Sequence, residues 1–148
     1  MSEIGKLEVS VVIKRPVEEV FSFVNDPANE TLWSSGLVES SQISEGPVGV
    51  GTIMREVNRI LGKRIENTYE ITEYEPNRRY SCKSISGPFP WQGSFTFESV
   101  KGGTKVTMAS EFQIGGFFKL AEPIVIRMAK RQFEADFKNL KDLMESQS

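Results

Sequence analysis

The chain has 148 residues, with 18 basic and 20 acidic side chains and a formal net charge of −2 at pH 7. This length suits one domain with its own hydrophobic core, and the balanced charge gives no basic face for nucleic acid. Histidine is absent and Cys82 is the only cysteine, which excludes histidine-dependent triads, cysteine–histidine dyads, CxxC redox pairs and ordinary zinc sites. We therefore expect one domain over residues 1–148, with no metal and no other cofactor.

The start of the chain carries no targeting signal that we can identify. Its first twenty residues lack the basic segment and apolar run of a signal peptide. One cysteine cannot form a disulfide within the chain, which fits a reducing compartment. We expect a cytoplasmic protein without stable membrane insertion.

Two short helices are expected to follow a first strand. Residues 7–13 alternate between apolar and polar side chains, which predicts a half-buried strand. Pro16 suits the first turn of a helix, where Glu18 and Glu19 would lie beside the positive end of the helix dipole. The segment Asn-Asp-Pro then ends this helix, and a second short helix is predicted over residues 28–34.

The middle of the chain predicts an antiparallel meander. Glycines and prolines divide residues 37–114 into short extended segments. After the glycine pair at residues 115–116, apolar residues recur at steps of three and four, which predicts a long amphipathic C-terminal helix. Pro123 is expected to kink this helix or to mark a break before it.

Four hairpin turns chosen on turn chemistry set the register of the meander. They are Gly62-Lys63, Pro76-Asn77, residues 87–90 and Gly102-Gly103. This register predicts a charged outer face with Arg55, Arg59, Glu66, Glu70 and Lys83. It predicts an inner face with Met54, Glu56, Asn58, Asn67, Tyr69, Ile71, Glu73, Tyr80, Cys82, Trp91, Phe95, Phe97, Met108 and Phe112.

The order of elements, with the segments RPVEEVFSFVNDPANETLW, GPVGVGT, YEITEYEPNRRYSCKSISGPFPWQGSFTFESVKGGTKVT and EFQIGGFFKL, resembles the START-like, helix-grip (SRPBCC) superfamily. Within it, the chain looks most like small bacterial proteins of the polyketide cyclase/dehydrase and lipid-transport type. The resemblance implies an α+β fold in which a curved seven-stranded antiparallel sheet wraps around the C-terminal helix, with two short helices after the first strand. It also implies a cavity between sheet and helix.

The polar residues of the inner face are candidates for chemistry. The predicted register sets Glu56 opposite Tyr69 and Glu73 opposite Tyr80. Burial of an unpaired carboxylate is costly, so each glutamate must be solvated, hydrogen-bonded or protonated. One interpretation is a carboxylate–tyrosine acid–base pair. The other is a pair of cross-strand hydrogen bonds near a wet rim.

A larger set of residues is predicted to line the ligand site. Trp33 is expected to end the helix that closes the cavity, Trp91 to lie at its mouth, and Phe117 and Phe118 to gate entry. For all of these, core packing is the competing interpretation. The full set is Trp33, Met54, Glu56, Asn58, Asn67, Tyr69, Tyr80, Trp91, Phe95, Met108, Phe112, Phe117 and Phe118.

Three functions remain open at this point. The leading hypothesis is binding or transport of an apolar small molecule, such as a lipid, polyketide or aromatic compound, in the internal cavity. The second is a cyclase, dehydratase or isomerase that uses a cavity carboxylate and a tyrosine. The third is a regulatory interaction module that acts through the apolar start of the last helix. We expect a monomer or weak homodimer.

Overall fold

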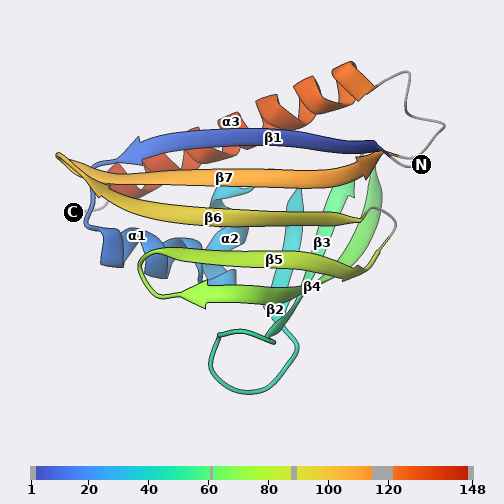
Figure 1. The fold of residues 1–148 in the computed structure, drawn as a ribbon, viewed down its shortest axis with the longest axis horizontal. Helices are drawn as coiled ribbons and strands as arrows, with labels where there is room; N and C mark the ends of the chain where they lie inside the picture. The colour runs from blue at the N-terminus through green and yellow to red at the C-terminus, as the bar shows by residue number, and fades with distance from the viewer. Residues whose placement is uncertain (1–2, 61, 88–89, 115–121, 147–148) are drawn as a thin grey trace.

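The computed structural model describes residues 3–60, 62–87, 90–114 and 122–146. Its elements follow the predicted order of one strand, two helices, six strands and a final helix (Figure 1). They are β1 (Glu3–Ile13), α1 (Val17–Val24), α2 (Pro27–Trp33), β2 (Leu37–Gln42), β3 (Ile53–Ile60), β4 (Lys63–Glu75), β5 (Arg79–Ser86), β6 (Trp91–Val100), β7 (Gly103–Ile114) and α3 (Glu122–Glu145).

Local sequence accounts for both short helices. Pro16 is the N-cap of α1, and Glu18 and Glu19 occupy its first turn, as predicted. Asp26 caps α2 because its side chain accepts a hydrogen bond from the backbone N–H of Ala28 at 2.9 Å, and Pro27 begins that helix. The tight succession of the two helices places α2 beside β2 and α3.

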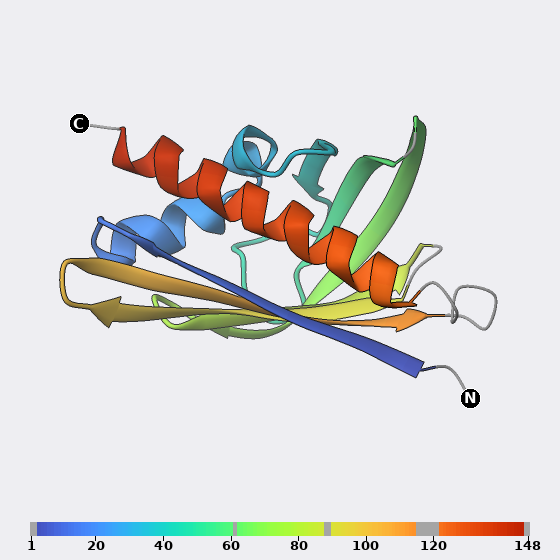
Figure 2. The same ribbon diagram turned by 90° about the horizontal axis from the view of Figure 1, so that it is seen from above.

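The seven strands form one antiparallel sheet in the order β1-β7-β6-β5-β4-β3-β2. The sheet bends, and α3 crosses its concave side together with α1 and α2 (Figure 2). β3 and β4 rise on the same side as the helices, around the N-terminal part of α3 (Figure 2). The predicted helix-grip α+β fold is therefore confirmed. None of the helices in the described residues is long and apolar enough to cross a membrane.

Three of the four hairpin registers differ from the prediction by two residues. Asn58 lies opposite Ile65 rather than Asn67, and Tyr80 lies opposite Phe95 rather than Phe97. The β6–β7 hairpin is shifted in the same direction, so that Phe95 pairs with Met108. A shift by two keeps every side chain on its predicted face, because side chains alternate along a strand.

The β4–β5 hairpin contains the one change that moves a predicted residue to the other face. Asn77 has a positive φ of 65°, and the pairing is interrupted between Ile71 and Glu73. This bulge brings Tyr74 opposite Tyr80 and Glu73 opposite Ser81. The predicted Glu73–Tyr80 pair is therefore wrong, and Glu73 points outward, where it contacts the Arg79 guanidinium at 3.3 Å.

The outer face carries the predicted charges. Arg59, Glu66 and Lys83 are exposed, whereas Arg55 and Glu70 are half-buried. The Arg55 guanidinium donates to Glu66 at 2.7 Å, instead of pairing with Glu70 as the predicted register required.

A core of fully buried side chains fills the space between β1, β7, β6 and the two longer helices. It joins Val106 and Met108 of β7 to Phe97 of β6 and to Phe137 and Leu140 of α3. Phe21 of α1 belongs to the same core; its ring contacts those of Tyr74, Tyr80 and Phe97 at centroid distances of 5.6, 6.3 and 5.1 Å. This end of the concave face is closed by apolar side chains.

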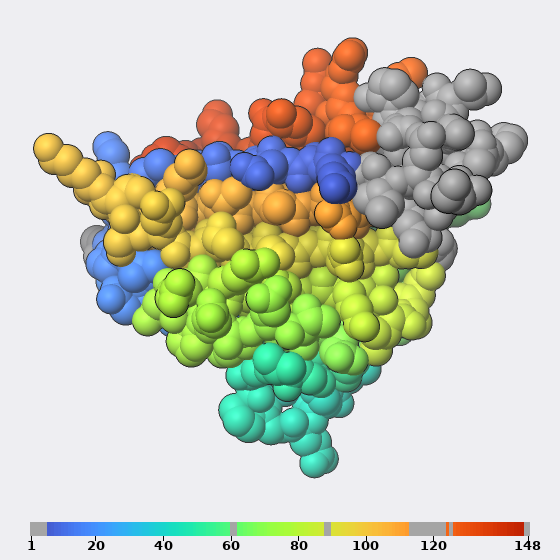
Figure 3. All heavy atoms as spheres, viewed as in Figure 1, coloured from blue at the N-terminus to red at the C-terminus, as the bar shows by residue number. Residues whose placement is uncertain are grey.

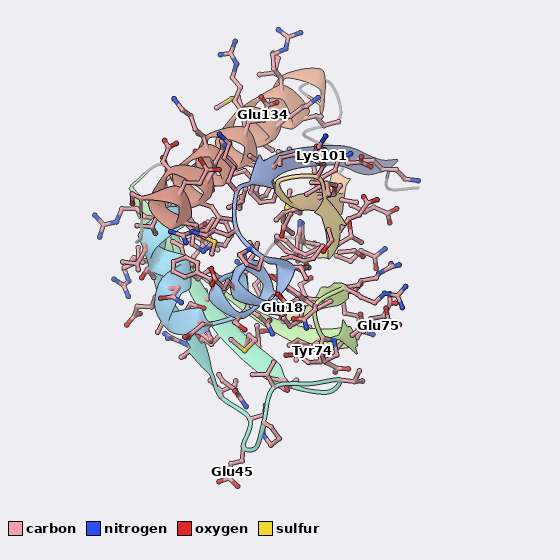
Figure 4. The ribbon with its side chains drawn as sticks, turned by 90° about the vertical axis from the view of Figure 1, so that its left-hand side faces the viewer. Glu18, Glu45, Tyr74, Glu75, Lys101 and Glu134 are labelled. Atoms are coloured by element: carbon pink, nitrogen blue, oxygen red, sulfur yellow. The ribbon has the colours of Figure 1, made fainter. Side chains whose placement is uncertain are left out.

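The segment between β2 and β3 projects from the body of the molecule (Figure 3). Glu45 lies at its outer end, far from the concave face (Figure 4). The base of the segment is held by hydrogen bonds, including Ile43 N–H to the carbonyl of Ile53 at 2.9 Å and Gly49 N–H to the Thr52 hydroxyl at 2.9 Å. The glycines of this segment lead into strand β3 rather than a helix, so they do not form a phosphate-binding loop.

Candidate functional site

A row of three polar residues crosses the concave face near the β2 edge of the sheet. Ser40 of β2 lies opposite Glu56 of β3, which in turn lies opposite Asn67 of β4. The predicted direct pair of Glu56 with Tyr69 is therefore wrong: Tyr69 lies one step along β4, opposite Met54. Glu56 and Tyr69 still share the concave face as diagonal neighbours.

Glu30 of helix α2 lies next to this row of residues, on the side of the sheet that the helices cover. Its carboxylate accepts a hydrogen bond from the Ser40 hydroxyl at 2.8 Å, and it lies within hydrogen-bond reach of the Glu56 carboxyl. Burial raises the pKa of Glu56 well above its ordinary value, and the neighbouring Glu30 raises it further. The raised pKa favours the protonated form of the Glu56 carboxyl.

Three more acidic groups lie in the same electrostatic environment. Burial raises the pKa of the phenols of Tyr69 and Tyr80, and it raises the pKa of the Cys82 thiol to about 12. The charges of Glu30 and Glu56 raise all three pKa values further. At neutral pH these groups are therefore a neutral thiol and two neutral phenols, able to donate hydrogen bonds and unable to act as nucleophilic anions.

Trp91 is fixed across the neighbouring part of the face. Its indole N–H donates to the Ser110 hydroxyl at 3.2 Å, and its ring meets Tyr69 edge-on at 5.4 Å between centroids. The indole lies over Gly93, where a Cβ would come within 2.5 Å of the ring. The absence of a side chain at this position is what lets Trp91 lie flat on the strand.

Two buried polar atoms, one in Trp33 and one in Asn67, have no hydrogen-bond partner among the residues that the structure describes. Trp33 is 6% exposed and its Nε1 is unpartnered; it follows Glu30 by one turn of α2. Asn67 is 8% exposed and its Oδ1 is unpartnered. Buried polar groups in folded proteins almost always have a partner, which sets these two atoms apart. The Asn67 oxygen faces Gly87 at the end of β5, where a Cβ would lie 2.0 Å from it.

Apolar side chains surround this polar group. Met54, Phe95 and Phe112 are half-buried on the concave face, whereas Met108 is fully buried. The ring of Phe95 stacks on that of Tyr80 at 4.9 Å and lies 6.4 Å from that of Phe137 on α3. The concave face is thus closed at Met108 and keeps accessible surface at Met54 of β3, Phe95 of β6 and Phe112 of β7.

The structure brings together most, but not all, of the predicted site residues. Glu73 lies on the outer face and is separated from the others by the sheet. Asn58 is half-buried between Leu37 and Ile65, one step beyond Glu56 toward the end of β3. Phe117 and Phe118 lie outside the described residues.

Sequence reasoning missed Glu30 and Ser40, although both contact each other beside Glu56. Glu30 precedes Trp33 by three residues, a spacing that puts both on one face of a helix. That spacing could have identified Glu30 as a residue on the same helix face as Trp33. Ser40 gave none, because a serine in an edge strand is ordinary and only the position of α2 brings Glu30 to it.

The described residues contain no group of three or more side chains suited to hold a metal ion. The hollow between the β1–α1 corner and the β6–β7 turn, lined by Lys14, Arg15, Ser99 and Gly102 among others, is open to solvent. It lies on the surface and takes in none of the predicted site residues.

The fold is similar to several solved structures at low sequence identity. TTHA0849 from Thermus thermophilus has a TM-score of 0.82 at 20% identity, covering 97% of this chain and 99% of that one. The Zhui aromatase/cyclase from Streptomyces sp. R1128 has a TM-score of 0.79 at 14% identity, covering 97% and 94%. Ara h 8.0201 has a TM-score of 0.75 at 16% identity, covering 98% and 100%. These likenesses concern the fold alone.

No curated protein sequence matches the chain. A family model, described as polyketide cyclase / dehydrase and lipid transport, matches residues 5–145. This match spans all of the described helices and strands apart from the first residues of β1. The chain therefore belongs to the polyketide cyclase / dehydrase and lipid transport family.

Proposed function

We propose that the protein binds an apolar small molecule between α3 and the β3–β5 part of the concave face. The observation that carries this proposal is a difference in side-chain burial between two parts of the concave face. The Met108 end is closed by fully buried side chains, whereas Met54, Glu56 and Tyr69 are only half-buried under the same helix layer. Side chains that face inward and still have accessible surface border unfilled space.

The polar groups on the concave face are suited to orient such a ligand. A mostly apolar site takes its specificity from a few polar groups, and here these are the carboxyl pair of Glu30 and Glu56 and the phenol of Tyr69. The unpartnered Trp33 Nε1 adds one hydrogen-bond donor. Trp91, held by Ser110 and Tyr69, supplies a fixed aromatic wall.

The test is native mass spectrometry of the protein purified from its own host, together with titration of a neutral fluorescent probe, N-phenyl-1-naphthylamine. We expect a retained molecule or saturable probe binding with a blue-shifted emission. Glu56→Gln and Tyr69→Phe should change probe affinity, whereas Glu98→Gln, on the outer face of β6, should not. Absence of both a retained molecule and saturable probe binding would overturn the proposal.

A second function, acid–base catalysis on the bound molecule, is favoured by one observation. The Glu56 carboxyl, whose pKa is raised chiefly by burial, lies beside the Glu30 carboxyl, and two neighbouring carboxyl groups are the usual means of acid–base catalysis without histidine. This chemistry suits a cyclisation, dehydration or isomerisation, in which a proton is removed at one atom and returned at another. Turnover of a polyketide-like β-polyketone that fails in both Glu30→Gln and Glu56→Gln would establish it, and binding without turnover would leave the carrier function alone.

A further inference from the structure

The solvent-facing side of α3 carries two large apolar side chains in its first two turns. Ile124 is 62% exposed and Met128 is 64% exposed. They are one helical turn apart and therefore lie on the same face of α3. Phe133 follows Ile124, and Phe137 follows Met128, by two and a half turns, and both phenylalanines pack against the hydrophobic core. Ile124 and Met128 thus point away from the core, so core packing does not account for them.

Basic side chains border the two apolar residues. Arg127, Lys130 and Arg131 are exposed, and each arginine follows one member of the apolar pair by three residues, so it lies beside that residue. From residue 123 to residue 133 the sequence contains these three basic residues and no acidic one; the nearest acids are Glu122 and Glu134. The whole chain has a net charge of −2, so this is a local positive region on a slightly negative molecule.

We call the surface formed by Ile124, Arg127, Met128, Lys130 and Arg131 the α3 face. The part of α3 that carries it protrudes above β1 at the upper edge of the molecule (Figure 3). The same end of α3 lies beside β3 and β4, the strands that bring Met54, Glu56 and Tyr69 to the concave side (Figure 2). The α3 face is therefore an accessible surface next to the proposed ligand site.

Charge and composition favour an anionic lipid surface over a protein as the partner of the α3 face. Two copies of the chain packed through this face would bring their arginines and lysines together, which like-charge repulsion disfavours. The face contains no aromatic residue, although aromatic residues are enriched at the centre of protein–protein interfaces. Exposed apolar residues bordered by basic ones on a helix are instead typical of helices that lie in the membrane interface.

We propose that the protein docks on membranes that contain anionic lipids through the α3 face. Ile124 and Met128 enter the boundary between head groups and acyl chains, while Arg127, Lys130 and Arg131 pair with lipid phosphates. The contact is peripheral and reversible, because two apolar side chains bury too little surface for permanent anchoring. This inference goes beyond the proposed binding function. Docking would also set the β3–β4 side of the molecule close to the bilayer, in which apolar molecules dissolve.

The test is flotation of the purified protein with vesicles of phosphatidylcholine alone and with vesicles that also contain phosphatidylglycerol. We expect the partition coefficient to be at least about tenfold higher on the anionic vesicles at low ionic strength, because each basic residue near a charged bilayer strengthens binding. This difference should shrink as sodium chloride is raised from about 0.05 M to about 0.5 M, because salt screens the attraction.

Two double variants separate the basic and apolar contributions. Arg127→Gln/Arg131→Gln should lower the partition coefficient on anionic vesicles by about tenfold. Ile124→Thr/Met128→Gln should lower it by at least about fivefold, because the apolar surface that enters the bilayer is reduced. All four positions are exposed, so the fold should be retained. Circular dichroism and the urea midpoint check this for each variant.

Matched controls lie on the outer face of the sheet. Lys83→Gln/Lys105→Gln removes the same amount of charge from two exposed positions of β5 and β7. Ile85→Gln removes an apolar side chain that is 48% exposed on β5. Neither control should change the partition coefficient on anionic vesicles.

Several outcomes would overturn the inference. They are equal partition into the two kinds of vesicle, control variants that weaken binding as much as the α3 variants, and full binding by Ile124→Thr/Met128→Gln. Self-association in analytical ultracentrifugation that Met128→Gln abolishes, without vesicle binding, would assign the α3 face to a second copy of the chain. Binding to immobilised polyglutamate that matches binding to anionic vesicles would assign it to an acidic protein.

The vesicle measurements do not use the fluorescent probe, so the two proposals can fail separately. If the probe does not bind and no molecule is retained while anionic vesicles still bind the protein, the proposed ligand-binding function fails and membrane docking stands. If the probe binds and anionic vesicles do not bind the protein, the inference is wrong and the ligand-binding function stands.

Discussion

Asp136 on α3 accepts two hydrogen bonds from Ser35, one from the backbone N–H at 3.0 Å and one from the hydroxyl at 2.7 Å. Gln132, one turn earlier on α3, donates to the same carboxylate oxygen at 3.0 Å. These bonds join the C-terminal half of α3 to the segment between α2 and β2. They fix the position of α2, and with it Glu30 and Trp33, relative to the concave face.

Asp136→Ala should therefore destabilise the protein and loosen α2. Asp136 is 3% exposed, and its loss leaves the Ser35 donors without a partner, so we expect a decrease of about 2–4 kcal/mol in the free energy of unfolding. Urea denaturation measures this change. Glu134→Ala, at an exposed position of the same helix (Figure 4), is the control and should change stability by less than about 0.5 kcal/mol. Equal effects of the two variants would contradict the role of Asp136.

Gly93→Ala should displace Trp91. A Cβ at Gly93 would lie 2.5 Å from the indole, so the ring must move and its hydrogen bond to Ser110 must break. We expect a loss of about 1–3 kcal/mol in stability and a red shift of Trp91 fluorescence, measured in a Trp33→Phe background. Gly49→Ala is the matched control, since a Cβ there meets no atom within 4 Å. An unchanged spectrum in Gly93→Ala would show that Trp91 does not depend on this glycine.

The stability of the protein should depend on pH through Glu56. Its pKa is raised in the folded state, so the folded protein binds more protons than the unfolded chain above the ordinary glutamate pKa of about 4.3. The stability that the protonated carboxyl contributes is fully present below that value and is lost as pH rises through the pKa of the folded state. Glu56→Gln should remove this decline and raise the free energy of unfolding at pH 7 by about 1–4 kcal/mol.

Other titratable groups also contribute to the pH dependence of stability, so the comparison must isolate the contribution of Glu56. Burial also raises the pKa of Asp136, which adds to the decline, whereas Arg55 and Lys141 lower the pKa values of Glu66 and Glu145, which act in the opposite direction below about pH 4.5. The quantity to compare is thus the difference between wild type and Glu56→Gln from pH 4 to pH 8. A difference that does not change with pH would contradict the raised pKa of Glu56.

Cys82 should be unreactive in the folded protein. Burial, followed by the charges of Glu56 and Glu30, raises its pKa to about 12, so only about one thiol in ten thousand is ionised at pH 8. We expect iodoacetamide to label native Cys82 at least 100-fold more slowly than the urea-unfolded chain, as followed by mass spectrometry. Comparable rates in the two states would show that the thiol is accessible and ionised.

The sequence predicted which face of the sheet a residue lies on more reliably than it predicted which residues pair across neighbouring strands. Three registers were wrong by two residues because the turns were centred one position too late. Gly62 has φ +80° and Gly102 φ +87°, and each is the second residue of its turn rather than the first. Gly103, read as a turn residue, is needed instead where a Cβ would lie 2.2 Å from the carbonyl oxygen of Ile13. Alternation preserved the faces, so the concave residues of β3 and β6 were still predicted.

The candidate site was predicted only as far as strand periodicity reaches. Glu56, Tyr69 and Trp91 follow from alternation, but the bulge before Glu73 adds one residue, and hydrophobic pattern alone does not place it. Glu30 belongs to a helix of seven residues whose inward face depends on how Asp136 holds the α2–β2 junction. In both cases the position of the side chain depends on tertiary contacts, which the local sequence pattern does not specify.

The bulge in β4 divides one strand into two parts that can vary separately. Before the bulge, Asn67, Tyr69 and Ile71 face the concave side of the sheet, and after it Tyr74 contacts the aromatic core. An insertion or deletion on one side of the bulge would change which residues face inward on that side. The bulge would take up the change, so the residues on its other side would keep their orientation. The first half of β4 can therefore change its inward residues while the second half keeps Tyr74 packed against Phe21.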